Sequence, residues 1–267
     1  MTRIEDLCHT HVSHKWIYHL DACAGSVLSP HDFITNIQKR LGNRAWEGHG
    51  ECRLCGSFLD PQLEHAETCS TAEATRGHYA CVHAVVCGMK LADPNITTEP
   101  RGLTASQSRP ADIFTTTAVP GRSAALDVCI ASSNAAAARG DAAQAAFDRT
   151  LSHYSREIPE LQNQGIHYRP LVWTADGRPH PAVTRTLQYA GDIASSRNGQ
   201  QMSAKSLQHR WKHQIAILRR RASMTRAVLP NPTPRAAWLL AGTIDRATDT
   251  WGYAFLPWMA HLTTIMT

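Results

Sequence analysis

The sequence predicts an α/β fold in which helices flank a mixed sheet, and three observations lead to this fold class. After residue 72, short runs rich in Ile, Val, Phe and Thr alternate with longer segments of helical periodicity. Pro and Gly separate these runs. Helical segments stand both between and after the strand-like runs, which is typical of a sheet covered by helices.

Five segments space their apolar residues three and four apart, as helices do. They are Asp32–Leu41, Ala72–Leu91, Ala135–Ile158, Ala182–Ala194 and Ser203–Leu229. Pro94 prevents continuation of the second helix, and we expect Pro159 to end the third, because proline breaks the hydrogen bonding of a helix interior.

Three runs read as strands. Ala111–Ala118 and Ser123–Ala131 are joined by a turn at residues 119–122, which contains Pro-Gly. His167–Thr174 reads as a buried strand, although it contains Pro170, which cannot donate a hydrogen bond to a neighbouring strand. The mixed sheet would be built from these runs.

The chain has 267 residues, enough to bury an apolar core without disulfides. We divide it into an N-terminal helical segment (1–49), a Cys/His-containing segment (50–71), an α/β domain (72–229) and a C-terminal tail of unassigned role (230–267). Three prolines between 230 and 234 mark the last boundary.

No signal peptide and no apolar run of membrane-spanning length is visible in the sequence. We therefore expect a protein that is soluble, nuclear or otherwise intracellular, not secreted, and without a membrane partner. In such a compartment the eight Cys favour thiols or metal ligands over disulfides.

A cluster of Cys and His residues precedes the α/β domain. Two residues separate Cys52 from Cys55, and His65 and Cys69 follow, so that the four lie within a span of eighteen residues. Three thiolates and one imidazole suit tetrahedral zinc, and four protein ligands leave no open position, so the site would be structural. The alternative is a set of ordinary thiols. Buried free thiols remain the simpler interpretation for Cys81, Cys87 and Cys129.

Two carboxylates fall near the first strand pair. Asp112 precedes the first strand, and Asp127 lies within the second between apolar residues. A carboxylate in such a place requires a polar site, a partner or a metal ion. Two of them on paired strands can hold Mg²⁺ together with water and phosphate oxygens. Equally, Asp112 could cap a turn while Asp127 pairs with Arg122.

The run CRLCGSFLD…EHAETC, a helix, then RPADIF, LDV and a helix ending in Tyr154 resembles the restriction-like endonuclease region of non-LTR retrotransposons. That family places a CCHC zinc knuckle before a PD-(D/E)xK nuclease core. The resemblance covers roughly residues 30–229 and implies Mg²⁺-dependent DNA cleavage at an insertion target. It also implies a reverse transcriptase in the same or another chain.

Residue by residue, the resemblance matches Asp112 to the first acid of the motif, with Ala111 inserted after Pro110, and Asp127 to the second acid. Glu73 is a weaker candidate for an additional acid. The chain departs from the pattern at the lysine, whose retrotransposon position corresponds to Thr150. Arg149 beside it could face a phosphate, but a guanidinium is a poor proton-transfer group.

The segment from 193 to 244 contains no Asp or Glu. Basic residues occupy the polar positions of its expected helix: Lys205, Arg210, Lys212, Arg219, Arg220, Arg221 and Arg226. Such a surface favours DNA, or RNA, as partner. The alternatives are a solvated face and a nuclear-import signal.

Three hypotheses follow. The first is a metal-dependent DNA endonuclease that uses Asp112, Asp127 and Arg149. The second is a degenerate module that binds nucleic acid through the zinc knuckle and the basic helix without cutting it. The third is a protein-interaction domain in which zinc replaces missing core.

Overall fold

The computed structural model describes residues 33–34, 37–38, 41, 43–44, 51–52, 55–61, 65, 72–105, 109–132 and 140–198; the side chains of 72–77, 80 and 198 are not described. Several expectations from the sequence lie outside these residues. They are most of the helix at Asp32–Leu41, the ligand Cys69, the side chain of Glu73, the basic helix at Ser203–Leu229 and the tail at 230–267.

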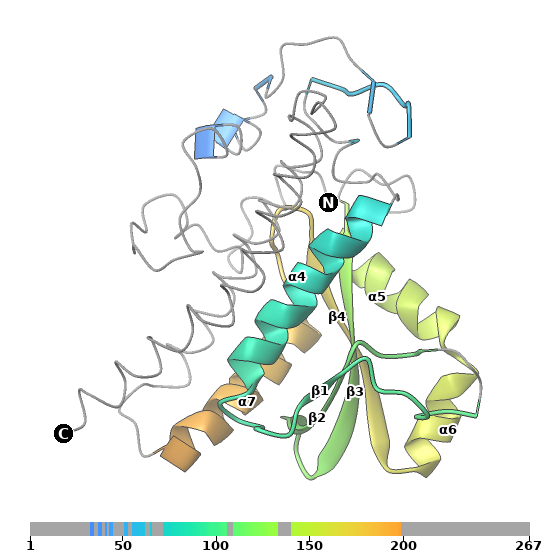
Figure 1. Cartoon of the computed structure of the whole chain (residues 1–267), viewed down its shortest axis with the longest axis vertical. Coiled ribbons are helices and arrows are strands. Elements are labelled where there is room, and N and C mark those ends of the chain that lie inside the picture. Colours follow the sequence, from blue (N-terminus) through green and yellow to red (C-terminus); the bar gives the residue numbers. More distant parts are fainter. Residues whose placement is uncertain are drawn as a thin grey trace, which may run out of the picture.

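A four-stranded mixed sheet forms the centre of the described fold (Figure 1). Its order is β1 (Thr97–Thr98), β2 (Ile113–Val119), β3 (Arg122–Ala131) and β4 (Ile166–Thr174). The first three strands pair antiparallel, and β4 pairs parallel to β3. The prediction of a mixed sheet with flanking helices is confirmed, and the three expected strands begin and end within two residues of the observed ones. The short β1 was expected to be loop.

Strands β2 and β3 form a hairpin whose closing pair is Val119 and Arg122. Only Pro120 and Gly121 lie between them, and Gly121 has a φ of +66°. Glycine suits this position because residues with a Cβ rarely adopt that backbone conformation. The sequence therefore places the turn where the structure has it.

Pro170 lies inside β4, opposite Asp127 of β3. Within the described sheet β4 is an edge strand that pairs only with β3. A proline is tolerated there because its missing N–H can face away from the neighbouring strand.

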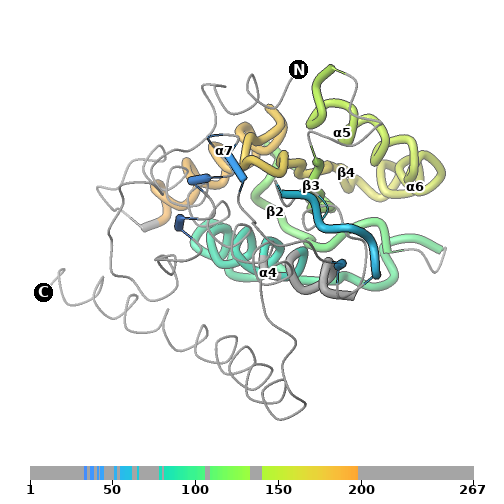
Figure 2. The backbone as a smooth tube through the Cα atoms, turned by 90° about the horizontal axis from the view of Figure 1, so that it is seen from above, coloured from blue at the N-terminus to red at the C-terminus, as the bar shows by residue number. Residues whose placement is uncertain are grey.

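Among the described residues, four helices flank the sheet: α4 (Ala72–Met89), α5 (Ala142–His153), α6 (Glu157–Asn163) and α7 (Pro181–Asn198). One core joins α4 and α7 to the sheet through buried residues such as Val85, Leu126 and Leu187. A second layer, in which Leu161 of α6 packs near Tyr168, covers the opposite face. Figure 2 shows α5 and α6 on the side of the strands away from α4.

Two helix predictions need correction. The helix expected at Ala135–Ile158 begins at Ala142, where Asp141 caps it, and it ends at His153. Pro159 does not end a helix; it is the third residue of α6. Proline fits there because first-turn N–H groups have no acceptor within the helix.

The face of α4 that packs on the sheet is apolar. Cys81, Val82, Val85 and Met89 are buried there, whereas Tyr79 is 47% exposed. No described helix is long and apolar enough to cross a membrane.

Candidate functional site

Two aspartates meet where the β2–β3 ladder ends. Ile113 of β2 pairs with Leu126 of β3 in antiparallel register, so the next residues outward are Asp112 and Asp127. In antiparallel strands, residues that face each other place their side chains on the same side of the sheet. The two carboxyl groups are near enough for Asp112 to raise the pKa of Asp127, both through its charge and as a hydrogen-bond partner.

Asp112 is held by two donors from different elements. Its Oδ2 accepts a hydrogen bond from the backbone N–H of Val128 at 2.7 Å. Its Oδ1 lies 3.0 Å from Nε2 of His78, which belongs to α4. The Asp112 side chain is 18% exposed, so it stays accessible from solvent.

Asp127 lies on the face of β3 that α5 and α6 cover, between the buried Ala125 and the half-buried Cys129. The hydroxyl of Tyr168 on β4 donates a hydrogen bond to its Oδ2 at 3.3 Å. Burial first, then the charge of Asp112 and the hydrogen bond to it, raise the pKa of Asp127 to about 7. His78 and Tyr168 oppose this rise.

A pKa near 7 means that Asp127 is protonated in about half of the metal-free molecules at neutral pH. Two adjacent carboxylates resist ionising together, because each charge disfavours the other. A proton or a cation must therefore compensate the pair. The structure does not support the alternative in which Asp127 pairs with Arg122. The groups that act on Asp127 are Asp112 and the hydroxyl of Tyr168.

His78 is a third titratable group at this site. Its hydrogen bond with Asp112 raises the pKa of its imidazole; partial burial opposes the rise, and the charges of Asp112, Asp127 and Glu99 add to it. A protonated His78 partly compensates the two carboxylates.

Two tyrosines line the other side of Asp127. The rings of Tyr154 and Tyr168 meet edge to face, with centroids 5.5 Å apart. The hydroxyl of Tyr154, just after α5, donates to the backbone carbonyl of Arg109 at 3.4 Å. Burial, with the nearby charge of Asp127, raises the pKa of Tyr168, so its hydroxyl keeps its proton and acts as a donor.

Among the described side chains, neither Arg149 nor Thr150 makes a described contact with the pair. Arg149 is exposed on α5 and makes no described hydrogen bond or ion pair with Asp112 or Asp127. Thr150 is half-buried on the same helix, and its carbonyl accepts from the N–H of Tyr154. Glu73 lies near the start of α4.

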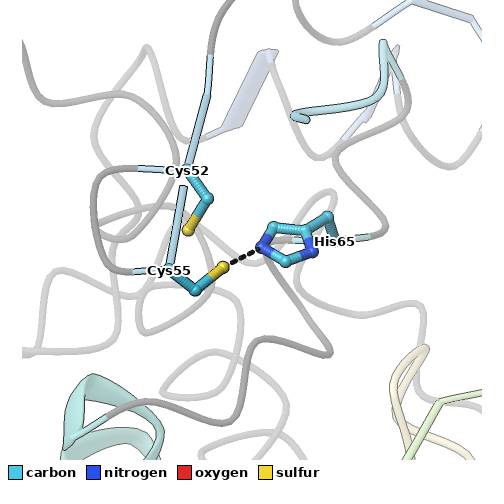
Figure 3. A group of neighbouring side chains, drawn as sticks. All are labelled: Cys52, Cys55 and His65. Carbon is cyan, nitrogen blue, oxygen red and sulfur yellow. Dashed lines mark hydrogen bonds between the residues drawn. The ribbon is translucent and has the colours of Figure 1, made fainter. Parts of the chain in front are cut away.

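Cys52, Cys55 and His65 form a second cluster, in which one ligand atom from each residue lies within 4.8 Å of the other two. Figure 3 shows the three side chains pointing toward one another. Sγ of Cys55 is 3.1 Å from Nε2 of His65. The cluster can bind a metal ion, because thiolate and imidazole at this spacing are typical metal ligands.

The backbone around Cys52 explains how the ligands converge. A bridge between Glu51 and Phe58 closes a tight loop, and the N–H of Cys52 donates to the carbonyl of Ser57 at 2.6 Å. Gly56 has a φ of +73°, and its N–H returns to the carbonyl of Cys52 at 2.7 Å. Cys52 itself is buried against Leu59. The loop thus holds two thiols side by side.

The loop between β4 and α7 supports the fold and does not face the pair. Arg178 is buried, and both terminal guanidinium nitrogens donate to Asp141, the cap of α5. The ring of His180 stacks on Phe147 with centroids 4.1 Å apart. These contacts tie α5 to the end of β4.

Reasoning from sequence missed His78 and Tyr168. A signal for His78 was present: it stands four residues before Val82, so it continues the buried face of α4 with a polar side chain. Tyr168 offered no signal, because an aromatic residue in a buried strand reads as core.

No protein-family model and no curated protein matches this chain.

Proposed function

We propose that the protein is a metal-dependent DNA endonuclease of retrotransposon origin, which hydrolyses phosphodiester bonds at an insertion target. The observation that carries this proposal is that Asp112 and Asp127 lie opposite each other at the end of the strand pair, with a pKa of Asp127 near 7. When both carboxylates are ionised, their negative charges need a compensating positive charge, and a divalent cation would supply it.

The donor set fits Mg²⁺. Mg²⁺ prefers oxygen ligands and is usually bound by one or two carboxylates, with water and substrate phosphate oxygens completing the shell. Asp112 and Asp127 would hold the ion. When bound, Mg²⁺ would lower the pKa of a water molecule and stabilise charge on the phosphate. The chain's own contribution is to hold the two carboxylates through Val128, His78 and Tyr168.

Zinc is the metal that we propose for the second cluster, with Cys69 as fourth ligand to Cys52, Cys55 and His65. Thiolates and imidazole together favour zinc over harder ions. Zinc there would cross-link the segment before α4 and orient the duplex.

For DNA contact we propose the basic residues of 205–226, together with Arg149, which is exposed on α5. Basic side chains that neutralise phosphates give affinity that depends on salt but not on sequence. RNA is a second polyanion that this surface could bind. A reverse transcriptase, in the same or a separate chain, would be the partner that uses the cleaved target.

The test is nicking of supercoiled plasmid DNA with and without Mg²⁺. Loss of a metal ligand removes several kcal/mol of transition-state stabilisation, so Asp127→Ala should slow nicking more than about 100-fold. Asp148→Ala is the matched control, because Asp148 is an exposed acid on α5 bonded only to Gln144 among the described residues. Equal rates for wild type and Asp127→Ala would refute the proposal.

A second candidate is a nucleic-acid-binding module that has lost cleavage. Two observations favour it: Thr150 occupies the lysine position, and Arg149 makes no described contact with Asp112 or Asp127. It predicts salt-sensitive DNA binding without nicking. Thr150→Lys discriminates between the two: if it creates Mg²⁺-dependent nicking in an inactive protein, the pocket is that of a degenerate nuclease.

A further inference from the structure

His78 is the point where α4 reaches the acidic pair. Nε2 of His78 and Oδ1 of Asp112 are 3.0 Å apart, and the two residues are 34 positions apart in the chain. The His78 side chain is 31% exposed. None of the sequence motifs includes this residue.

The backbone of Asp112 is held by hydrogen bonds that do not involve His78. Its N–H donates to the carbonyl of Leu126 at 3.0 Å, and its carbonyl accepts from the N–H of Glu99 at 2.7 Å. The carboxylate can still rotate about its own bonds. Val128 fixes Oδ2 and His78 fixes Oδ1, so the two donors together set the carboxylate plane. Each oxygen keeps one further lone pair for another partner.

We propose that His78 is a positioning residue, which orients the carboxylate of Asp112 so that it binds a divalent cation together with Asp127. The inference rests on the proposed nuclease function. Residues that hydrogen-bond to a metal ligand commonly orient it in this way, and their loss lowers metal affinity or activity by about 10- to 100-fold.

Two simpler roles fit the structure less well. A direct ligand role would require nitrogen of His78 and oxygens of both aspartates to converge, yet among the described residues only Cys52, Cys55 and His65 form a set of three within 4.8 Å. A purely structural role for His78 is not needed to hold α4 in place, because Val82, Val85 and Met89 already pack α4 against the sheet.

The experiment compares His78→Ala, His78→Gln and His83→Ala in the full chain. Gln can replace the ring N–H with an amide N–H donor, whereas Ala cannot. His83 is the matched control: it is an exposed histidine on the same helix, whose described contact is with Cys87. Mn²⁺ affinity is measured by electron paramagnetic resonance without DNA, and the Mg²⁺ concentration for half-maximal nicking is measured with it.

We expect His78→Ala to weaken Mn²⁺ binding about 10-fold and to raise the Mg²⁺ midpoint by a similar factor. His78→Gln should recover most of both losses, and His83→Ala should behave as wild type. A thermal melt of each variant separates these effects from unfolding.

The inference is overturned if His78→Ala melts earlier but binds Mn²⁺ as wild type does, or if His78→Gln fails as completely as His78→Ala. In that case Asp127-dependent nicking by the wild type would leave the nuclease proposal standing.

The wild type separates the two proposals. If it binds no Mn²⁺, both proposals fail. If it binds Mn²⁺ without nicking DNA, only the nuclease proposal fails, and the Mn²⁺ affinities of the variants still decide the role of His78.

Discussion

A carboxyl group that titrates near neutral pH makes the stability of a protein depend on pH. The pKa of Asp127 is about 7, above the ordinary value of 3.8, because burial and Asp112 disfavour its charge. Between those two values the folded chain retains a proton that the unfolded chain has lost. Stability from this group is therefore complete below pH 4 and is lost as the pH rises through 7.

We expect the metal-free wild type to lose on the order of 2 kcal/mol of unfolding free energy between pH 5 and pH 8 through this linkage. The raised pKa of His78 acts in the same direction. Urea unfolding at several pH values measures the effect. Asp127→Asn should flatten the profile, and Mg²⁺ should restore stability at pH 8, because it binds the folded state. A profile that Asp127→Asn leaves unchanged would contradict the assigned titration.

The partner of Asp127 on β4 allows a second test at a single residue. Tyr168→Phe removes the hydroxyl that donates to Oδ2 of Asp127 but keeps the ring that meets Tyr154. Since that hydrogen bond favours the charged carboxylate, its loss should raise the pKa of Asp127 further. Carbon-13 NMR titration of the Asp127 carboxyl measures the change. Tyr189→Phe, on α7, is the control, and a lower pKa in Tyr168→Phe would contradict the assigned contact.

Among the elements, α5 depends most clearly on a single residue at its start. Oδ1 of Asp141 accepts from the N–H groups of Ala143 and Gln144, and Asp141 also pairs with the buried Arg178. The cap made by Asp141 therefore explains why the helix begins at Ala142. The ion pair between Asp141 and Arg178 ties that start to the loop after β4.

Asp141→Ala should destabilise the fold by more than the roughly 1 kcal/mol of a lost cap, because it also removes the carboxylate that pairs with the buried Arg178. Asp141→Asn keeps a capping oxygen and removes only the charge, so the difference between the two variants reports the cap. Urea unfolding gives both values. Equal loss in the two variants would mean that the charge pair, and not the cap, dominates.

The elements were predictable where their signals are local. Short runs rich in Ile, Val, Phe and Thr identified the three longer strands, and Pro120-Gly121 identified the turn between the first two. The errors have a common cause. Pro159 was read as a helix end because the start of a new helix at Glu157 depends on packing of Leu161 against the sheet, which the sequence does not display. The two-residue β1 is too short to have a pattern.

Across the molecule, the two candidate metal sites can be tested independently, because their ligands differ in chemistry. Co²⁺ substitution should give the charge-transfer absorption of thiolate ligands, and Cys55→Ser should weaken it and lower the bound metal per chain. Cys87→Ser is the control, since Cys87 is a half-buried cysteine on α4 whose described neighbour is His83. Absorption that is equal in both variants would exclude Cys55 as a ligand.

The sequence alone determined the longer strands, the main helices of the α/β region and the Cys/His cluster, because these depend on residues that are close in the chain. Only the tertiary structure decided what surrounds the acidic pair. His78 is 34 residues from Asp112, and Tyr168 is 41 from Asp127. The register of β2 on β3, the parallel pairing of β4 and the docking of α4 bring them together, and none of these is encoded by local spacing.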